Sequence, residues 1–236
     1  MQACSRQHRI VGRVATWGAA TVLAMYLIVL ILGFLSLTSP DDPIGDPYFT
    51  ILEALILVVA PLMVVSMVVV HTCAPAESRV FSLTALVFMA LMAGITSTVH
   101  AVILTVSREL AAQGLAGAPM LFSFSWPSVA YALDILAWDW FFALSMISAA
   151  QAFTGGGRER AARVLMRISG VLSLAGLLGV PLANMSVRNI GIIGYAVIAI
   201  PAFLLMGLAF ERGGGHHCDT GGTDGQPSTP PNSGTD

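Results

Sequence analysis

Four ionisable residues lie inside apolar stretches of this sequence: Glu53, His100, Asp134 and Asp139. Carboxylates and an imidazole within a membrane can relay protons or hold a cation. Hydrocarbon does not solvate charge, so such side chains normally face protein or water, and they often mark a functional site. These residue types therefore direct attention to the exchange of a proton, an ion or a small molecule inside a membrane protein.

The first three of these residues are predicted to lie at one depth. With about 1.5 Å of rise per helical residue, Glu53, His100 and Asp134 lie roughly 8, 10 and 9 Å below the outer boundary of their helices. We therefore expect His100 and Asp134 to approach within a hydrogen bond or one bridging water, with Glu53 nearby. The three side chains would then line an outward-facing polar pocket.

Neighbouring polar residues extend this predicted cluster. Thr96, Ser97 and His100 form one polar stripe at helical spacing, which favours a partner helix or water over lipid. Tyr131 shares a helical face with Asp134. Two interpretations remain open at this point: the polar residues hold helices together, as single polar contacts in membranes often do, or they form a functional pocket.

Asp139 is predicted to lie near the midplane, apart from the other three. It follows Asp134 by five residues, about 140° around an α-helix, so we expect the two aspartates to meet different neighbours. No basic residue lies near it in the sequence. We therefore expect an uncharged Asp139 that donates a hydrogen bond to a backbone carbonyl freed by Pro61 or Pro181.

The elements that position these residues follow from composition. Of the 236 residues, 56% are hydrophobic and only 10% are charged, whereas soluble domains carry about 25% charged residues. A helix needs roughly 20 apolar residues to span a membrane. The sequence predicts an all-α integral membrane bundle of six transmembrane helices, in a domain over 15–212, at about 15–37, 49–70, 82–106, 128–152, 165–186 and 190–210.

Arginines predict the orientation of the bundle. Two arginines, Arg108 and Arg188, fall on one side of the predicted membrane, and nine fall on the other. Positive charge concentrates in cytoplasmic loops, so both termini are expected to be cytoplasmic. We expect anionic lipid head-groups to contact four arginines of one loop, namely Arg158, Arg160, Arg163 and Arg167.

The two ends of the chain are predicted to lie outside the membrane-spanning domain. Residues 1–14 form a cytoplasmic N-terminal segment, and 213–236 form a disordered cytoplasmic tail rich in glycine, proline and small polar residues. Cys4, Cys73 and Cys218 all fall on the cytoplasmic side, where thiols stay reduced, so no disulfide is expected. The "HHC" of the tail is a weak metal motif.

No cofactor is expected. The sequence lacks H-E-x-x-H and G-x-S-x-G motifs, and no block of like charge suggests nucleic acid. Glu53, His100 and Asp134 are acceptable zinc ligands, but one histidine is fewer than most catalytic zinc sites use.

Two stretches, "GITSTVHAVILTVSR" and "FSFSWPSVAYALDILAWDWFF", resemble an uncharacterised group of bacterial multi-pass membrane proteins. The resemblance implies a bacterial cytoplasmic membrane and attaches no activity or catalytic residue.

Three hypotheses follow. The first is a multi-pass membrane protein of unknown specific activity whose outward-facing pocket handles an ion or small molecule. The second is a membrane-embedded metal-dependent hydrolase, and the third is a non-catalytic scaffold. The sequence favours a non-enzymatic protein over an enzyme.

Overall fold

The computed structural model describes residues 4–39, 42–114 and 117–211, which form helices and no strand. Six helices are long and apolar enough to cross a membrane, which confirms the predicted fold class. These spans are Arg6–Leu35, Tyr48–Thr72, Ala76–Leu110, Val129–Ala152, Arg158–Gly179 and Met185–Glu211.

Most spans consist of several helical elements. The elements are α1 (Arg6–Leu35), α2 (Tyr48–Thr72), η1 (Ala76–Ser78), α3 (Arg79–Val102), η2 (Ile103–Ser107), α4 (Arg108–Ala112), α5 (Ala118–Phe122), α6 (Val129–Ile135), η3 (Leu136–Phe142), α7 (Ala143–Ala149), η4 (Ala150–Ala152), α8 (Arg158–Gly176), η5 (Leu177–Gly179), α9 (Met185–Ile192), η6 (Ile193–Ile198) and α10 (Ala199–Glu211). Three of them, η2, η3 and η6, are π-helical. Short π-helical segments within α-helices occur frequently at functional sites.

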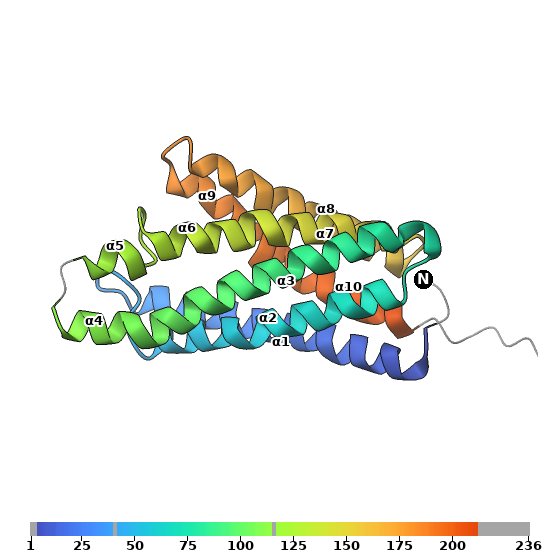
Figure 1. Ribbon diagram of the computed structural model, residues 1–236, viewed down its shortest axis with the longest axis horizontal. Coiled ribbons are helices and arrows are strands. Elements are labelled where there is room, and N and C mark those ends of the chain that lie inside the picture. The colour runs from blue at the N-terminus through green and yellow to red at the C-terminus, as the bar shows by residue number, and fades with distance from the viewer. Residues whose placement is uncertain (1–3, 40–41, 115–116, 212–236) are drawn as a thin grey trace, which may run out of the picture.

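The six spans close into a ring. Helix α1 packs against α2 and α10, α2 against α3, α3 against α7, α7 against α8, and α8 against α10. The start of α1 and the end of α10 lie at one end of the bundle (Figure 1), where an Arg13–Glu211 ion pair of 3.1 Å joins them. We call this the termini end. The opposite end holds the α1–α2 and η5–α9 connections together with α4 and α5, and we call it the Asp46 end.

Several helix boundaries differ from the prediction. Helix α1 begins at Arg6 instead of 15, so most of the predicted N-terminal segment 1–14 is helical and continuous with the first span. The fifth span ends at Gly179 instead of 186, and the sixth begins at Met185 after a turn. The Asn184 side chain caps the new helix by accepting hydrogen bonds from the Ser186 and Val187 N–H groups, at 3.0 and 3.2 Å. The predicted tail 213–236 lies outside the described residues.

The interior is rich in methionine. Seven methionines are fully buried: Met63, Met67, Met89, Met92, Met146, Met166 and Met206. Phe142, Phe153 and Phe203 complete this core. Because methionine is unbranched and flexible, it fills irregular gaps between helices. The buried charged residues lie outside this apolar core and are grouped in one region of the bundle.

A disulfide between Cys4 and Cys73 ties the segment before α1 to the end of α2. The expectation of no disulfide was therefore wrong. It rested on the compartment alone, whereas the fold brings the two Cα atoms to 5.3 Å, within the range a disulfide requires. Residues 69 positions apart in sequence carry no local signal of such an approach.

Candidate functional site

Five charged or ionisable side chains meet inside the bundle, and we call them the ionic cluster. They are Glu53 of α2, His100 of α3, Asp134 of α6, Asp139 of η3 and Arg188 of α9. All five residues are at most 9% exposed. Helices from four different spans and a π-helical segment thus converge on one buried group of charges.

The imidazole of His100 bridges two carboxylates. Its Nδ1 lies 2.7 Å from Glu53 Oε2, and its Nε2 lies 3.4 Å from Asp134 Oδ1. The structure therefore brings together the three residues that were predicted to share a depth. The order Glu53, His100, Asp134 is a carboxylate–imidazole–carboxylate chain, an arrangement suited to passing a proton from one carboxylate to the other.

Arg188 is the cluster residue that sequence reasoning missed. It was assigned to a loop, but it lies in α9 and is 3% exposed. Its Nη2 lies 3.8 Å from Asp134 Oδ2, and its Nε lies 3.5 Å from Asp139 Oδ2. The available signal was Pro181 followed by Asn184, a turn residue and a helix cap that place the start of the helix before Arg188.

Aromatic rings surround the guanidinium of Arg188. Its Cζ lies 5.0 Å from the ring centroid of Tyr131 and 5.8 Å from that of Tyr195. Such cation–π contacts favour a desolvated cation. The predicted cluster residue Tyr131 thus contributes through Arg188, and Tyr195 joins the site from the π-helical η6.

Asp139 does not behave as predicted. It shares Arg188 with Asp134 instead of meeting separate neighbours. The reason is that η3 is π-helical, and in a π-helix the bonded residues are five apart, which brings Asp139 back toward the side of Asp134. Asp139 also makes no hydrogen bond to a backbone carbonyl, so the expected donor role toward a proline-freed carbonyl was wrong.

Two glycines make room for the Asp139 carboxylate. A Cβ placed on Gly176 of α8 would lie 2.7 Å from Asp139 Oδ1, and a Cβ on Gly191 of α9 would overlap the same oxygen. The two glycine backbones also approach each other, since a Cβ on Gly191 would lie 3.4 Å from the Gly176 Cα. Close packing of α8 and α9 therefore depends on glycine at both positions.

The other predicted residues lie around the cluster. The buried Thr96 hydroxyl accepts a hydrogen bond of 3.0 Å from Trp138 Nε1, so it anchors η3 against α3. Ser97 is half-buried and takes no part in the ion pairs. Phe124 covers His100, with ring centroids 5.2 Å apart and planes tilted by 35°.

Several buried polar atoms of the cluster lack a hydrogen-bond partner. Within the described residues these atoms are His100 Nε2, Asp134 Oδ1, both carboxylate oxygens of Asp139, and Arg188 Nε and Nη2. The charged groups attract one another across 3.4–3.8 Å, beyond good hydrogen-bond geometry. Apart from the hydrogen bond between His100 and Glu53, the cluster is therefore held together by attraction between charges.

The proposed zinc ligands are not arranged around a common point. The two ring nitrogens of His100 face Glu53 and Asp134 separately, so the imidazole lies between the carboxylates. Among the described residues no group of three histidines, cysteines or acidic residues could hold a metal ion. Within the described part of the chain, Glu53, His100 and Asp134 are therefore not arranged as the ligands of one metal ion.

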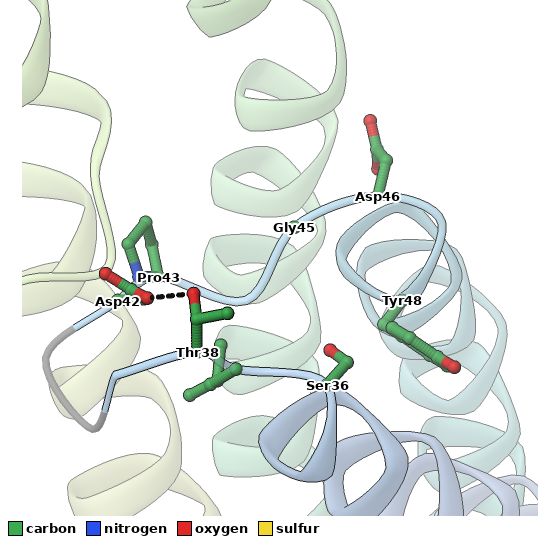
Figure 2. Close-up of a pocket in the computed structure, with 8 residues that line it drawn as sticks. Ser36, Thr38, Asp42, Pro43, Gly45, Asp46 and Tyr48 are labelled. Carbon is green, nitrogen blue, oxygen red and sulfur yellow. Dashed lines mark hydrogen bonds between the residues drawn. The ribbon is translucent and has the colours of Figure 1, made fainter.

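A cavity of about 460 Å³ opens at the Asp46 end. It is lined by Ser36, Leu37, Thr38, Asp42, Pro43, Gly45, Asp46 and Tyr48 (Figure 2). The Asp42 carboxylate accepts hydrogen bonds from the Thr38 hydroxyl at 2.8 Å and from the Ser39 N–H at 2.9 Å. Asp46 instead pairs with Arg108, at 3.1 Å.

The four arginines that were predicted to lie in a loop belong to the first turns of α8, and three of them have protein partners. Arg158 Nη1 lies 3.5 Å from Glu211 Oε2, Arg163 donates to the Phe153 carbonyl at 2.6 Å, and Arg167 donates to the Gln151 amide oxygen at 3.0 Å. Their side chains line the termini end of the bundle, and contact with lipid head-groups stays a prediction.

Six apolar spans around a buried ionic cluster make the chain a multi-pass membrane protein. Comparison with protein-family models found no match, and comparisons with curated proteins and with solved structures found none either.

Proposed function

We propose that this chain is a proton-handling membrane protein, whose ionic cluster takes up and releases a proton in the course of moving or sensing an ion. We propose a bacterial cytoplasmic membrane as its location, with anionic lipid head-groups at the arginines of the termini end. The ionic cluster is the site of the activity.

The observation that carries this proposal is the charge balance of the cluster. Three carboxylates, Glu53, Asp134 and Asp139, face one guanidinium and one imidazole. Even with His100 protonated, the fully ionised carboxylates leave one negative charge in excess. Isolated charge is costly in a membrane interior, so the cluster favours binding one further proton or a monovalent cation.

Distances within the cluster favour the proton over a larger ligand. Facing charged atoms lie only 2.7–3.8 Å apart, so no organic molecule fits between them. A proton needs no such room. This spacing supports our proposal of an ion instead of the small molecule that the sequence also left open.

His100 provides the transfer step. Protonated Glu53 gives its proton to Nδ1 of the ring, and the ring releases the proton of Nε2 to the Asp134 carboxylate. Glu53 loses one proton, Asp134 gains one, and the imidazole changes tautomer. Movement of a proton in the reverse direction restores the original tautomer.

Infrared difference spectroscopy tests the proposal. The purified protein in lipid bilayer discs is compared at neutral and mildly acidic pH, and the carboxyl C=O band is followed together with proton uptake. We expect a band that Glu53→Gln and Asp134→Asn each alter, with reduced proton uptake. Glu77→Gln is the control, because Glu77 is exposed and lies in η1, outside the ionic cluster.

Two outcomes decide the matter. Spectra and proton uptake that are identical in the wild type and in both cluster variants contradict the proposal and assign the cluster a purely structural role. Loss of the band in both cluster variants, with the Glu77→Gln spectrum unchanged and all variants folded, supports it.

A further inference from the structure

A polar face of α2 connects the Asp46 end to the ionic cluster. Asp46, Thr50 and Glu53 are spaced by four and three residues, so they lie along one side of the helix start. Asp46 Oδ1 accepts a hydrogen bond from the Thr50 N–H at 3.2 Å and another from the Thr50 hydroxyl. Glu53 lies one turn deeper and is 4% exposed. A solvent-accessible and a buried carboxylate thus lie on a single helical face, with Thr50 between them in the sequence.

Arg108 lies over the outer part of this face. Its Nη2 donates to both carboxylate oxygens of Asp46, each at 3.1 Å, and to the Thr50 hydroxyl. It is also close enough to Glu53 to interact with it electrostatically. The Arg108 and Asp46 side chains are 43% and 57% exposed, and exposed ion pairs are weak. Arg108 can therefore leave Asp46 without large-scale unfolding.

The other approach from the Asp46 end is apolar. Phe124 covers His100 with a tilted ring, and the rings of Phe124 and Tyr131 meet edge to face with centroids 6.4 Å apart. A phenyl ring carries no exchangeable proton. His100 is therefore shielded on this side, and the polar face of α2 leads to Glu53.

The cavity at this end provides an internal comparison. Figure 2 shows Asp42 directed at Thr38, whereas the Asp46 carboxylate points away from the other labelled residues. Both aspartates line the same cavity. Only Asp46 is held by Arg108 and Thr50 and stands at the start of α2. Asp42 is thus a carboxylate of the same surface that lies off the polar face.

We infer that protons enter the ionic cluster from the Asp46 end along Asp46, Thr50 and Glu53. While Arg108 is paired with Asp46 and Thr50 it blocks this route, and the route opens when the Arg108 side chain moves away. The inference rests on the proposed function. The Asp46 carboxylate takes a proton from solvent, and the Thr50 hydroxyl accepts one and passes its own toward Glu53.

The charged and titratable groups around the route come from four elements other than α2. Glu53 faces His100 of α3, Asp134 of α6 and Arg108 of α4, with the phenol of Tyr26 in α1 also near. Asp46 faces Arg108. Arg108 is the group common to both carboxylates, which is why its removal affects entry at the surface and the buried acceptor together.

Stopped-flow proton uptake tests the route. Protein in lipid bilayer discs is mixed with mildly acidic buffer, and a pH-indicator dye gives the rate and the amplitude. Asp46→Asn should slow uptake by about tenfold, the low end of the range over which charged surfaces concentrate ions, and should leave the amplitude unchanged. Arg108→Gln should give a rate above that of the wild type, and the matched control Asp42→Asn should behave as the wild type.

Three results separate the possibilities. If the Glu53→Gln variant takes up as many protons as the wild type, the proposed function itself fails. If uptake depends on Glu53 but Asp46→Asn matches the wild type, or Asp42→Asn slows it equally, only the route is overturned. If Phe124→Ala accelerates uptake more than Arg108→Gln does, protons enter past Phe124 and the route is likewise overturned. Asp46 is exposed, so its variant should fold, and size-exclusion chromatography checks that it does.

Discussion

Replacing Arg188 by methionine should destabilise the bundle strongly. Arg188 is the guanidinium that both Asp134 and Asp139 approach, and it is 3% exposed. Methionine keeps most of the side-chain volume but removes the charge. Two carboxylates are then left in the interior without a guanidinium partner, and their mutual repulsion is no longer offset.

The distances set the expected magnitude. Removing one partner of a buried ion pair costs about 3–5 kcal/mol, because the other charge remains buried and uncompensated. The contacts of 3.5 and 3.8 Å are longer than good hydrogen bonds, so we expect the lower part of that range, about 3 kcal/mol. Arg108→Met is the matched control, since it breaks an exposed pair worth about 0.2–1 kcal/mol.

Unfolding in mixed micelles, followed by circular dichroism, measures both free energies. A second variant identifies the cause: Asp139→Asn removes one of the stranded charges. In the double variant Arg188→Met with Asp139→Asn we expect recovery of about 1–3 kcal/mol relative to additive effects. An Arg188→Met variant as stable as Arg108→Met, or additive effects in the double variant, would refute the electrostatic account of the cluster.

Further predictions concern glycine packing, acid titration and orientation. Gly191→Ala should cost about 1–3 kcal/mol by overpacking against Asp139, whereas Gly94→Ala, which meets nothing within 4 Å, should be neutral or stabilising in the same unfolding assay. The Thr50 hydroxyl, assisted by Arg108, lowers the pKa of Asp46. The Asp46 contribution to stability is therefore present above the ordinary pKa of about 3.9 and is lost as pH falls through the lower folded value. An NMR titration should show Thr50→Val raising that pKa, and an unchanged value would contradict the assignment. In a cysteine-free background, a cysteine placed in the α1–α2 connection should react with an impermeant maleimide in intact cells, and one placed between η4 and α8 should not; the reverse pattern would invert the orientation.

The fold was predictable because hydrophobic length is a strong signal. A run of roughly 20 apolar residues has few alternatives to a membrane helix. Helix ends were less predictable, because a charge was taken as a boundary. Arg188 separated two apolar runs and was assigned to the turn, whereas the real turn ends at Asn184 and Arg188 lies one turn inside the helix. A charged residue marks a boundary only where no buried partner compensates it.

The site was predictable in depth but not in detail. Helical rise alone predicted that Glu53, His100 and Asp134 lie together. Ionisable side chains at one depth in a small bundle avoid lipid, so they meet in the same interior region. The pairing of Asp139 with Arg188 depends on a π-helical segment, and no residue pattern in "LAWDWFF" distinguishes that segment from an α-helix. The Cys4–Cys73 contact likewise depends on tertiary packing.

The π-helical segment η3 has a consequence for how this span tolerates insertion and deletion. A π-turn holds about one residue more than an α-turn, so the helix after it is turned by about 100° relative to an uninterrupted α-helix. This offset lets Asp134 of α6 face the cluster while Met146 of α7 faces the apolar core. Deleting a single residue within η3 would replace the π-turn by an α-turn and leave both faces directed as they are, whereas the same deletion in a regular α-helical part of the span would rotate one face by about 100° toward lipid. The fourth span should therefore tolerate the loss of one residue better within η3 than in α6 or α7, where the same deletion would separate Asp134 from the face that carries Met146.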